Sequence, residues 1–78
     1  MNVEFDGKEY KITRGSVVTN NKDGVSVELS DTSNNRILIE IFHSDIDKTE
    51  IFFAEKIELP FELIRLLVKT ADNWFKND

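Results

Sequence analysis

The sequence predicts an α+β fold in which a curled antiparallel meander sheet of five to six strands packs on a single C-terminal helix. Two patterns of apolar residues lead to this prediction. In several short segments before residue 58, apolar and polar residues alternate, which is the period of a half-buried strand. From Pro60 onwards, apolar residues recur every three or four positions, which is the period of a helix lying on a core. The connections are too short for a parallel sheet, which needs crossovers of about a dozen residues.

Turn signals divide the N-terminal part into strands. Asp6-Gly7 stands between two alternating runs, and a two-residue Asp-Gly connection of this kind is typical of a β-hairpin. Thr13-Arg14-Gly15 is expected to separate two strands, and residues 20–24 are expected to form a loop. Gly7, Gly15 and Gly24 are therefore all interpreted as turn residues. The six expected strands are residues 3–5, 8–12, 16–19, 25–30, 37–43 and 50–57.

The helix is expected over residues 60–76. Pro60 fits its first turn, because the missing N–H of proline would have no partner there. Because a sheet with one apolar face needs a cover, we expect the helix to lie across the concave face. Trp74 and Phe75 are neighbours and cannot both face the core squarely, and we interpret them as packing residues. The positions expected to face the core are Phe61, Ile64, Leu67, Val68, Ala71, Trp74 and Phe75.

Length and composition indicate one compact domain over residues 1–78. The chain has 40% hydrophobic and 32% charged residues and no cysteine, so its core has to be apolar, without disulfides or a thiolate metal site. The lack of cysteine suits a reducing compartment, and we expect a cytoplasmic location. The start, residues 1–5, lacks the pattern of a secretory signal, and no apolar run reaches the roughly 20 residues that cross a bilayer.

The formal net charge of −5 argues against direct binding of nucleic acid, which relies on basic residues that neutralise phosphates. Residues 37–59 carry six acids and two lysines, and therefore −4 of this charge. The excess negative charge thus belongs to one segment, which is expected to form a hairpin.

The same segment holds the only histidine, together with a serine and two aspartates that are candidates for catalysis or metal binding. His43 and Ser44 are adjacent in a strand, where successive side chains point to opposite faces, so they make a poor nucleophile and base pair. The acids from Asp45 onwards are typical of the start of a calcium loop. The sixth position of that loop should be glycine but is Glu50, and the twelfth should be glutamate but is Lys56. We therefore expect no catalytic residues, metal, cofactor or small-molecule substrate.

The two strands of this hairpin are apolar on both faces, although one helix covers only one face. If an odd number of residues forms the loop, the face of Ile37, Ile39 and Ile41 continues into Ile51 and Phe53. Leu38, Phe42, Phe52 and Ala54 then gather on the reverse side. Either the curled sheet covers this reverse patch, or the patch stays exposed within a rim of Glu40, Glu50 and Lys56 and binds protein. The candidate protein-binding residues are Leu38, Glu40, Phe42, Asp45, Asp47, Glu50 and Phe52.

Three functions follow from these patterns. The preferred one is a non-enzymatic interaction domain that binds a protein partner, or a second copy of itself as a homodimer, through the hairpin. The alternative is an acidic inhibitor or immunity-type protein that occupies the basic nucleic-acid-binding surface of its target. The third, a small enzyme that uses the acids of residues 40–58, is discounted because the chain is too small to enclose a cleft around them.

Overall fold

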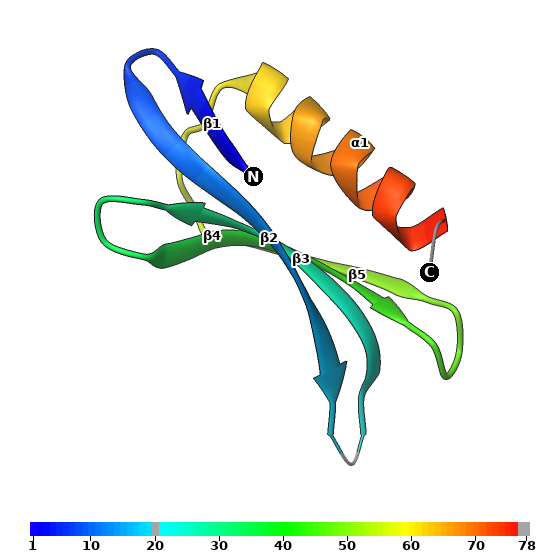
Figure 1. Cartoon of the computed structure of the whole chain (residues 1–78). Helices are drawn as coiled ribbons and strands as arrows, with labels where there is room; N and C mark the ends of the chain where they lie inside the picture. The colour runs from blue at the N-terminus through cyan, green and yellow to red at the C-terminus, as the bar shows by residue number, and fades with distance from the viewer. Residues whose placement is uncertain (20, 77–78) are drawn as a thin grey trace.

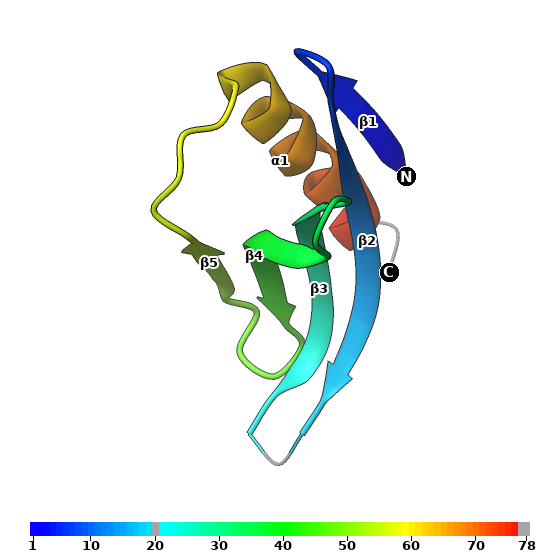
Figure 2. The same cartoon turned by 90° about the vertical axis from the view of Figure 1, so that its left-hand side faces the viewer.

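The computed structural model describes residues 1–19 and 21–76, and it consists of one antiparallel sheet and one helix (Figure 1). Five strands follow one another in the sheet in chain order, and the sheet stays open, with β1 at one edge and β5 at the other (Figure 2). The predicted α+β fold is confirmed, with five strands. The elements are β1 (Asn2–Phe5), β2 (Lys8–Val18), β3 (Asp23–Asp31), β4 (Arg36–Ser44), β5 (Glu50–Ala54) and α1 (Phe61–Lys76).

The two strands predicted over residues 8–12 and 16–19 are a single strand, because β2 runs without interruption through Thr13, Arg14 and Gly15. Each of these residues pairs with β3, Gly15 lying opposite Ser26. Pairing along the whole strand supplies partners for the backbone, so this triplet does not break the strand as predicted. Gly24 also lies within a strand, as the second residue of β3. Asn20 of the predicted loop lies outside the described residues.

The turn prediction is confirmed at Gly7. Asp6 and Gly7 both have positive φ angles, of 52° and 78°, as the two central residues of a type I′ hairpin turn require. The turn joins Phe5 to Lys8, which pair with each other at the end of β1 and β2.

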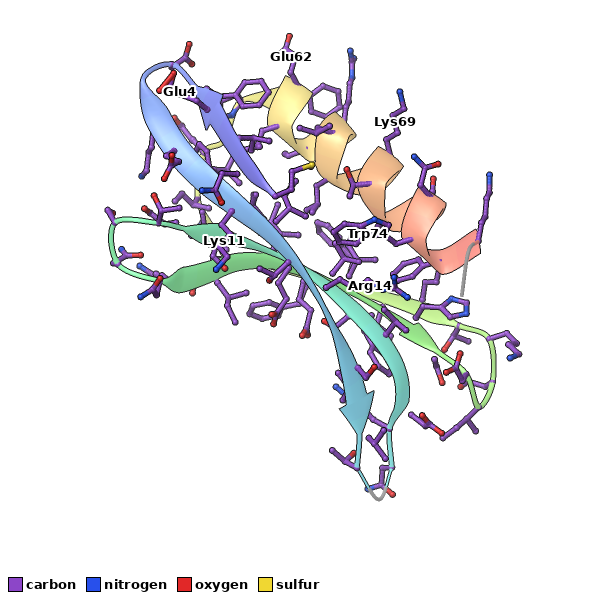
Figure 3. The ribbon with its side chains drawn as sticks, in the orientation of Figure 1. Glu4, Lys11, Arg14, Glu62, Lys69 and Trp74 are labelled. Carbon is purple, nitrogen blue, oxygen red and sulfur yellow. The ribbon has the colours of Figure 1, made fainter. Side chains whose placement is uncertain are left out.

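Helix α1 lies across one face of the twisted sheet (Figures 1 and 2). It begins directly after Pro60, whose carbonyl accepts hydrogen bonds from the N–H groups of Leu63 and Ile64 at 3.0 and 3.4 Å. Figure 3 shows Trp74 pointing from the helix toward the sheet, while Glu62 and Lys69 point away from it. The buried core joins the helix to the middle strands and consists of Tyr10, Ile12, Val27, Leu29, Leu38, Ile39, Leu63, Leu67 and Ala71.

The buried stripe of α1 is rotated from the predicted one. Leu63, Leu67 and Ala71, spaced four residues apart, face the core, whereas the predicted core positions Phe61 and Val68 are exposed. The helix has apolar residues over a wider arc than the sheet covers, so periodicity alone does not choose the central line of contact. Trp74 and Phe75 are both half-buried against the core, as expected for packing residues.

Candidate interaction surface

The pairing of β4 with β5 reverses the predicted register. Ile41 lies opposite Phe52, and Phe42 lies opposite Ile51. Phe52 and Ala54 therefore share the helix-facing side with Ile41. The reason lies in the connecting loop: the N–H of Ser44 donates to the carbonyl of Thr49 at 2.8 Å. This hydrogen bond leaves four residues between the paired positions, an even number, and a shift of one residue moves every side chain to the other face.

Leu38 does not lie on the reverse face, because β4 contains a bulge at this position. Leu29 pairs with Ile39 and Ser30 with Ile37, so Leu38 has no partner residue in β3. The extra residue re-aims its side chain, which is only 1% exposed and belongs to the core under α1. The prediction that Leu38 belongs to the reverse patch is therefore wrong.

Phe42 does lie on the reverse face, but it is only 5% exposed. Small neighbours on β3 make room for its ring: a Cβ atom built on Gly24 would lie 3.1 Å from the ring, and Ser26 is its cross-strand partner. The ammonium of Lys22 lies 5.2 Å from the ring centroid, a cation–π contact. Phe42 is thus covered by β3 and Lys22, in line with the covered alternative for the reverse patch, and it does not belong to the candidate surface.

The exposed apolar residues of the hairpin belong to β5. Every residue from Glu50 to Ala54 is exposed, and three consecutive large side chains, Ile51, Phe52 and Phe53, are 54%, 58% and 57% exposed. Phe52 points to the side of the helix, and Ile51 and Phe53 point to the reverse side. The edge of the sheet is therefore apolar on both faces.

The hydrogen bonds between β5 and β4 show which backbone N–H and C=O groups of β5 point away from the sheet. The N–H of Glu55 donates to the carbonyl of Leu38 at 3.0 Å, and the carbonyl of Thr49 accepts from Ser44. Backbone groups of alternate residues point to the same neighbour, so the odd-numbered residues of β5 are bonded to β4. The N–H and C=O groups of Glu50, Phe52 and Ala54 consequently point outward from the sheet.

A groove separates β5 from the helix on the side of Phe52. It has a volume of about 220 Å³, and its apolar lining comes from Ile41, Ile51, Phe52, Val68, Ala71 and Phe75. A shallower hollow of about 460 Å³ continues over α1 from Val68 to Phe61. The exposed side of the helix thus joins the exposed edge of the sheet.

The acidic loop that connects β4 to β5 lies beside this edge, with Asp45, Asp47 and Glu50 all exposed. The carboxylate of Asp47 accepts from the hydroxyl and the N–H of Thr49 at 2.7 and 3.1 Å, and these hydrogen bonds lower its pKa. The carboxylate of Glu50 lies 3.3 Å from Nδ1 of His43. The three carboxylates therefore stand at one end of β5.

His43 and Ser44 point to opposite faces, as predicted for neighbours in a strand. The His43 ring stacks on Phe75 with centroids 5.2 Å apart, whereas the buried Ser44 hydroxyl accepts from the N–H of Ile46 at 3.2 Å. The first contact joins β4 to the end of α1, and the second lies within the loop between β4 and β5.

Glu40, the remaining candidate, lies on the reverse face opposite Glu28. Its carboxylate accepts a hydrogen bond from the hydroxyl of Ser26 at 2.8 Å. Burial raises the pKa of Glu28, and the charge of Glu40 and a hydrogen bond to it raise this pKa further. Phe53 is the neighbour of Glu40 on β5, so this carboxyl pair borders the reverse side of the edge.

Sequence reasoning missed Ile51 and Phe53 as surface residues and placed Val68 in the core. Three consecutive large apolar residues in a short strand were the available signal, because a strand at an edge can bury only one side. The candidate surface is therefore the edge of β5 with its flanking groove. It consists of Ile51, Phe52, Phe53, Phe61, Val68 and the outer backbone of Glu50 to Ala54.

No family model, no curated protein and no solved structure matches this chain. In the part of the chain that the structure describes, no helix is long and apolar enough to cross a membrane. Within the same residues, no three histidine, aspartate or glutamate side chains converge as metal ligands.

Proposed function

We propose that this chain is a protein-interaction domain that binds an extended polypeptide strand along the outer edge of β5. The observation that carries the proposal is the exposure of Ile51, Phe52 and Phe53, each more than half accessible, on a strand whose outer backbone groups face solvent. The proposed activity is binding alone and includes no catalytic step or cofactor.

Edge strands of this kind are templates for a further strand. Proteins commonly protect a free edge with a charge, a proline or a bulge, because an unprotected one pairs with other chains. Here the only charged residue in β5 is Glu50, at its first position, and the centre of the strand is wholly apolar. An added strand would gain main-chain hydrogen bonds from β5 and side-chain contacts from both of its faces.

The proposal is tested by selecting peptides from a random display library on the wild-type domain and on the Ala54→Pro variant. Proline removes the outward N–H of residue 54 but no hydrogen bond to β4, so the fold should persist while the edge loses a donor. We expect selected peptides to bind the wild type and to bind Ala54→Pro at least about tenfold more weakly.

Ala54→Val is the matched control, because it changes the side chain and keeps the N–H. Bound peptides should also slow the amide hydrogen exchange of Phe52 and Ala54. Peptides that bind wild type and Ala54→Pro equally well, or that leave these two amides unprotected, would contradict the proposal.

The acidic inhibitor is a second candidate, supported by the exposed carboxylates of Asp45, Asp47 and Glu50 beside the same edge. Charges at the border of an interface act mainly on the association rate and its salt dependence. Replacing Asp45 and Asp47 with lysine should therefore slow association with a basic target at low salt. An unchanged rate and salt dependence would count against the inhibitor function.

A further inference from the structure

We infer that the strand bound at this edge is β5 of a second copy of the chain, antiparallel to the first, with a two-fold axis at Phe52. This inference rests on the proposed function, because it names the partner for the same surface. Two copies would join their five-stranded sheets into one continuous sheet.

The backbone geometry is self-complementary about Phe52. Glu50, Phe52 and Ala54 carry the outward N–H and C=O groups, and they stand symmetrically about the centre of β5. A two-fold axis at Phe52 places Phe52 opposite itself, and Glu50 opposite Ala54 of the second copy. All three are then hydrogen-bonding positions, so every outward group of the strand finds a partner.

The side chains are compatible with the same register. On the helix side, Phe52 meets its own copy across the axis, where aromatic pairs are favourable. On the reverse side, Ile51 meets Phe53 of the second copy in a close, non-hydrogen-bonded pair. The charged Glu50 faces alanine, so the paired strands place no like charges opposite each other.

Placing the two-fold axis one residue earlier or later would pair β5 with residues outside the strand. An axis at residue 51 would pair Ala54 with Lys48, which lies in the loop with a φ angle of 62°. An axis at residue 53 would pair Glu50 with Lys56, which follows the end of β5. Only the axis at Phe52 uses the whole strand and nothing outside it.

The axis stands perpendicular to the joined sheet, because antiparallel strands that continue a sheet are related in this way. Both copies of α1 consequently lie on the same side, and the two grooves flank the Phe52 pair. Pairing would thus cover the exposed aromatic side chains of the edge and use the apolar lining from Phe75 to Val68.

The first test is the solution mass over a concentration series up to roughly 1 mM, since a five-residue strand makes a small interface. We expect the wild type to pass from 9.1 kDa to twice this mass. Ala54→Pro should weaken the dimer about tenfold or more, because it removes one hydrogen bond on each side of the axis. Ala54→Val should dimerise like the wild type.

The second test uses cysteine cross-linking and does not depend on the proline variant folding. The chain contains no cysteine, so single substitutions are free of background. Under mild oxidation, a mixture of Glu50→Cys and Ala54→Cys should form the mixed disulfide faster than either variant alone forms its own dimer. In the proposed register residue 50 faces residue 54, whereas identical positions lie beyond disulfide reach.

Monomeric wild type throughout the series, or mixed disulfides that form no faster than the homodimeric ones, would overturn the inference. Failure of the inference is distinguishable from failure of the proposed function. A monomeric domain that still binds peptides in an Ala54→Pro-sensitive way loses only the second copy as partner, whereas a domain that binds neither loses both.

Discussion

Glu28 and Glu40 face each other across β3 and β4, on the side of the sheet away from the helix. The raised pKa of Glu28 means that the folded chain holds this proton more tightly than the unfolded chain does. Its contribution to stability is therefore fully present below its ordinary pKa of 4.5 and is lost as the pH rises through the folded pKa. At neutral pH the pair is a source of repulsion.

We predict that Glu28→Gln stabilises the domain at pH 7 by up to about 1 kcal/mol, because it removes a like charge from directly opposite Glu40. The gain should shrink as the pH falls toward 4 and Glu28 of the wild type becomes protonated. Urea unfolding at pH 7 and pH 4 measures both effects. Glu58→Gln, an identical charge change at an exposed site, is the control, and an equal gain from it would refute the local explanation.

A second carboxylate has the opposite behaviour. Asp31 accepts hydrogen bonds from the hydroxyl and the N–H of Ser33 at 2.7 and 2.9 Å, and Lys8 lies 2.9 Å away. These partners lower the pKa of Asp31 to about 2. These hydrogen bonds hold the turn between β3 and β4, which is not part of the candidate surface. The strong shift in the pKa of Asp31 therefore reflects a structural role and does not mark a functional site.

Single residues were also where sequence reasoning was weakest. Alternation placed Leu38 and Phe42 on one face, but a bulge sends Leu38 into the core, and Gly24 makes room for the ring of Phe42. A bulge depends on how two strands pair, and burial beside a glycine depends on what lies across the sheet. Neither is encoded in the period of one strand.

At the scale of elements, the sequence predicted the helix and four of the strands, although the strand expected over residues 50–57 ends at Ala54. The helix signal is strong because Pro60 marks its start and its apolar period extends over four turns. The β5 face could not be predicted, because it depends on whether an even or an odd number of residues lies between the paired positions Ser44 and Thr49. The predicted break at Gly15 failed because β3 offers partners along the whole of β2.

Two strand glycines provide a prediction at this scale. A methyl group on Gly24 would overlap the carbonyl oxygen of His43, whereas one on Gly15 would meet nothing within 4 Å. Gly24→Ala should therefore lower the free energy of unfolding by about 1–3 kcal/mol, as expected for overpacking against backbone. Gly15→Ala should be neutral or stabilise by up to about 1 kcal/mol.

Thermal and denaturant unfolding of both variants measures the difference. Both substitutions add one methyl group to a strand of the same sheet, so a difference in stability between them reports the space available around each added Cβ. Equal effects of the two substitutions would show that strand propensity, and not the contact with His43, decides the outcome.

At the scale of the whole molecule, a single helix supplies one side of the core. Leu67 is buried against the sheet, while its neighbour Val68 is exposed in the groove. Leu67→Ala should lower the free energy of unfolding by about 2–5 kcal/mol, which is a large part of the stability of a domain this small. Val68→Ala should change it by less than about 0.5 kcal/mol.

Chemical unfolding of these two variants, monitored by circular dichroism, tests the rotated helix contact. The sequence pattern assigned both residues to the core, so it predicts similar losses. Comparable destabilisation by the two substitutions would support that pattern over the observed packing. The sequence could not separate them, because apolar residues surround more of α1 than one sheet contacts.

The loop between β4 and β5 sets the orientation of a strand that is apolar on both faces. For most half-buried strands, turning over would place polar side chains against the core, and this cost protects them from a change in loop length. β5 lacks that protection, because Ile51 and Phe53 on one side are as apolar as Phe52 on the other. Loop length, and not strand composition, therefore decides which aromatic ring the molecule presents. Insertion or deletion of one residue between Ser44 and Thr49 would exchange the two sides of the edge.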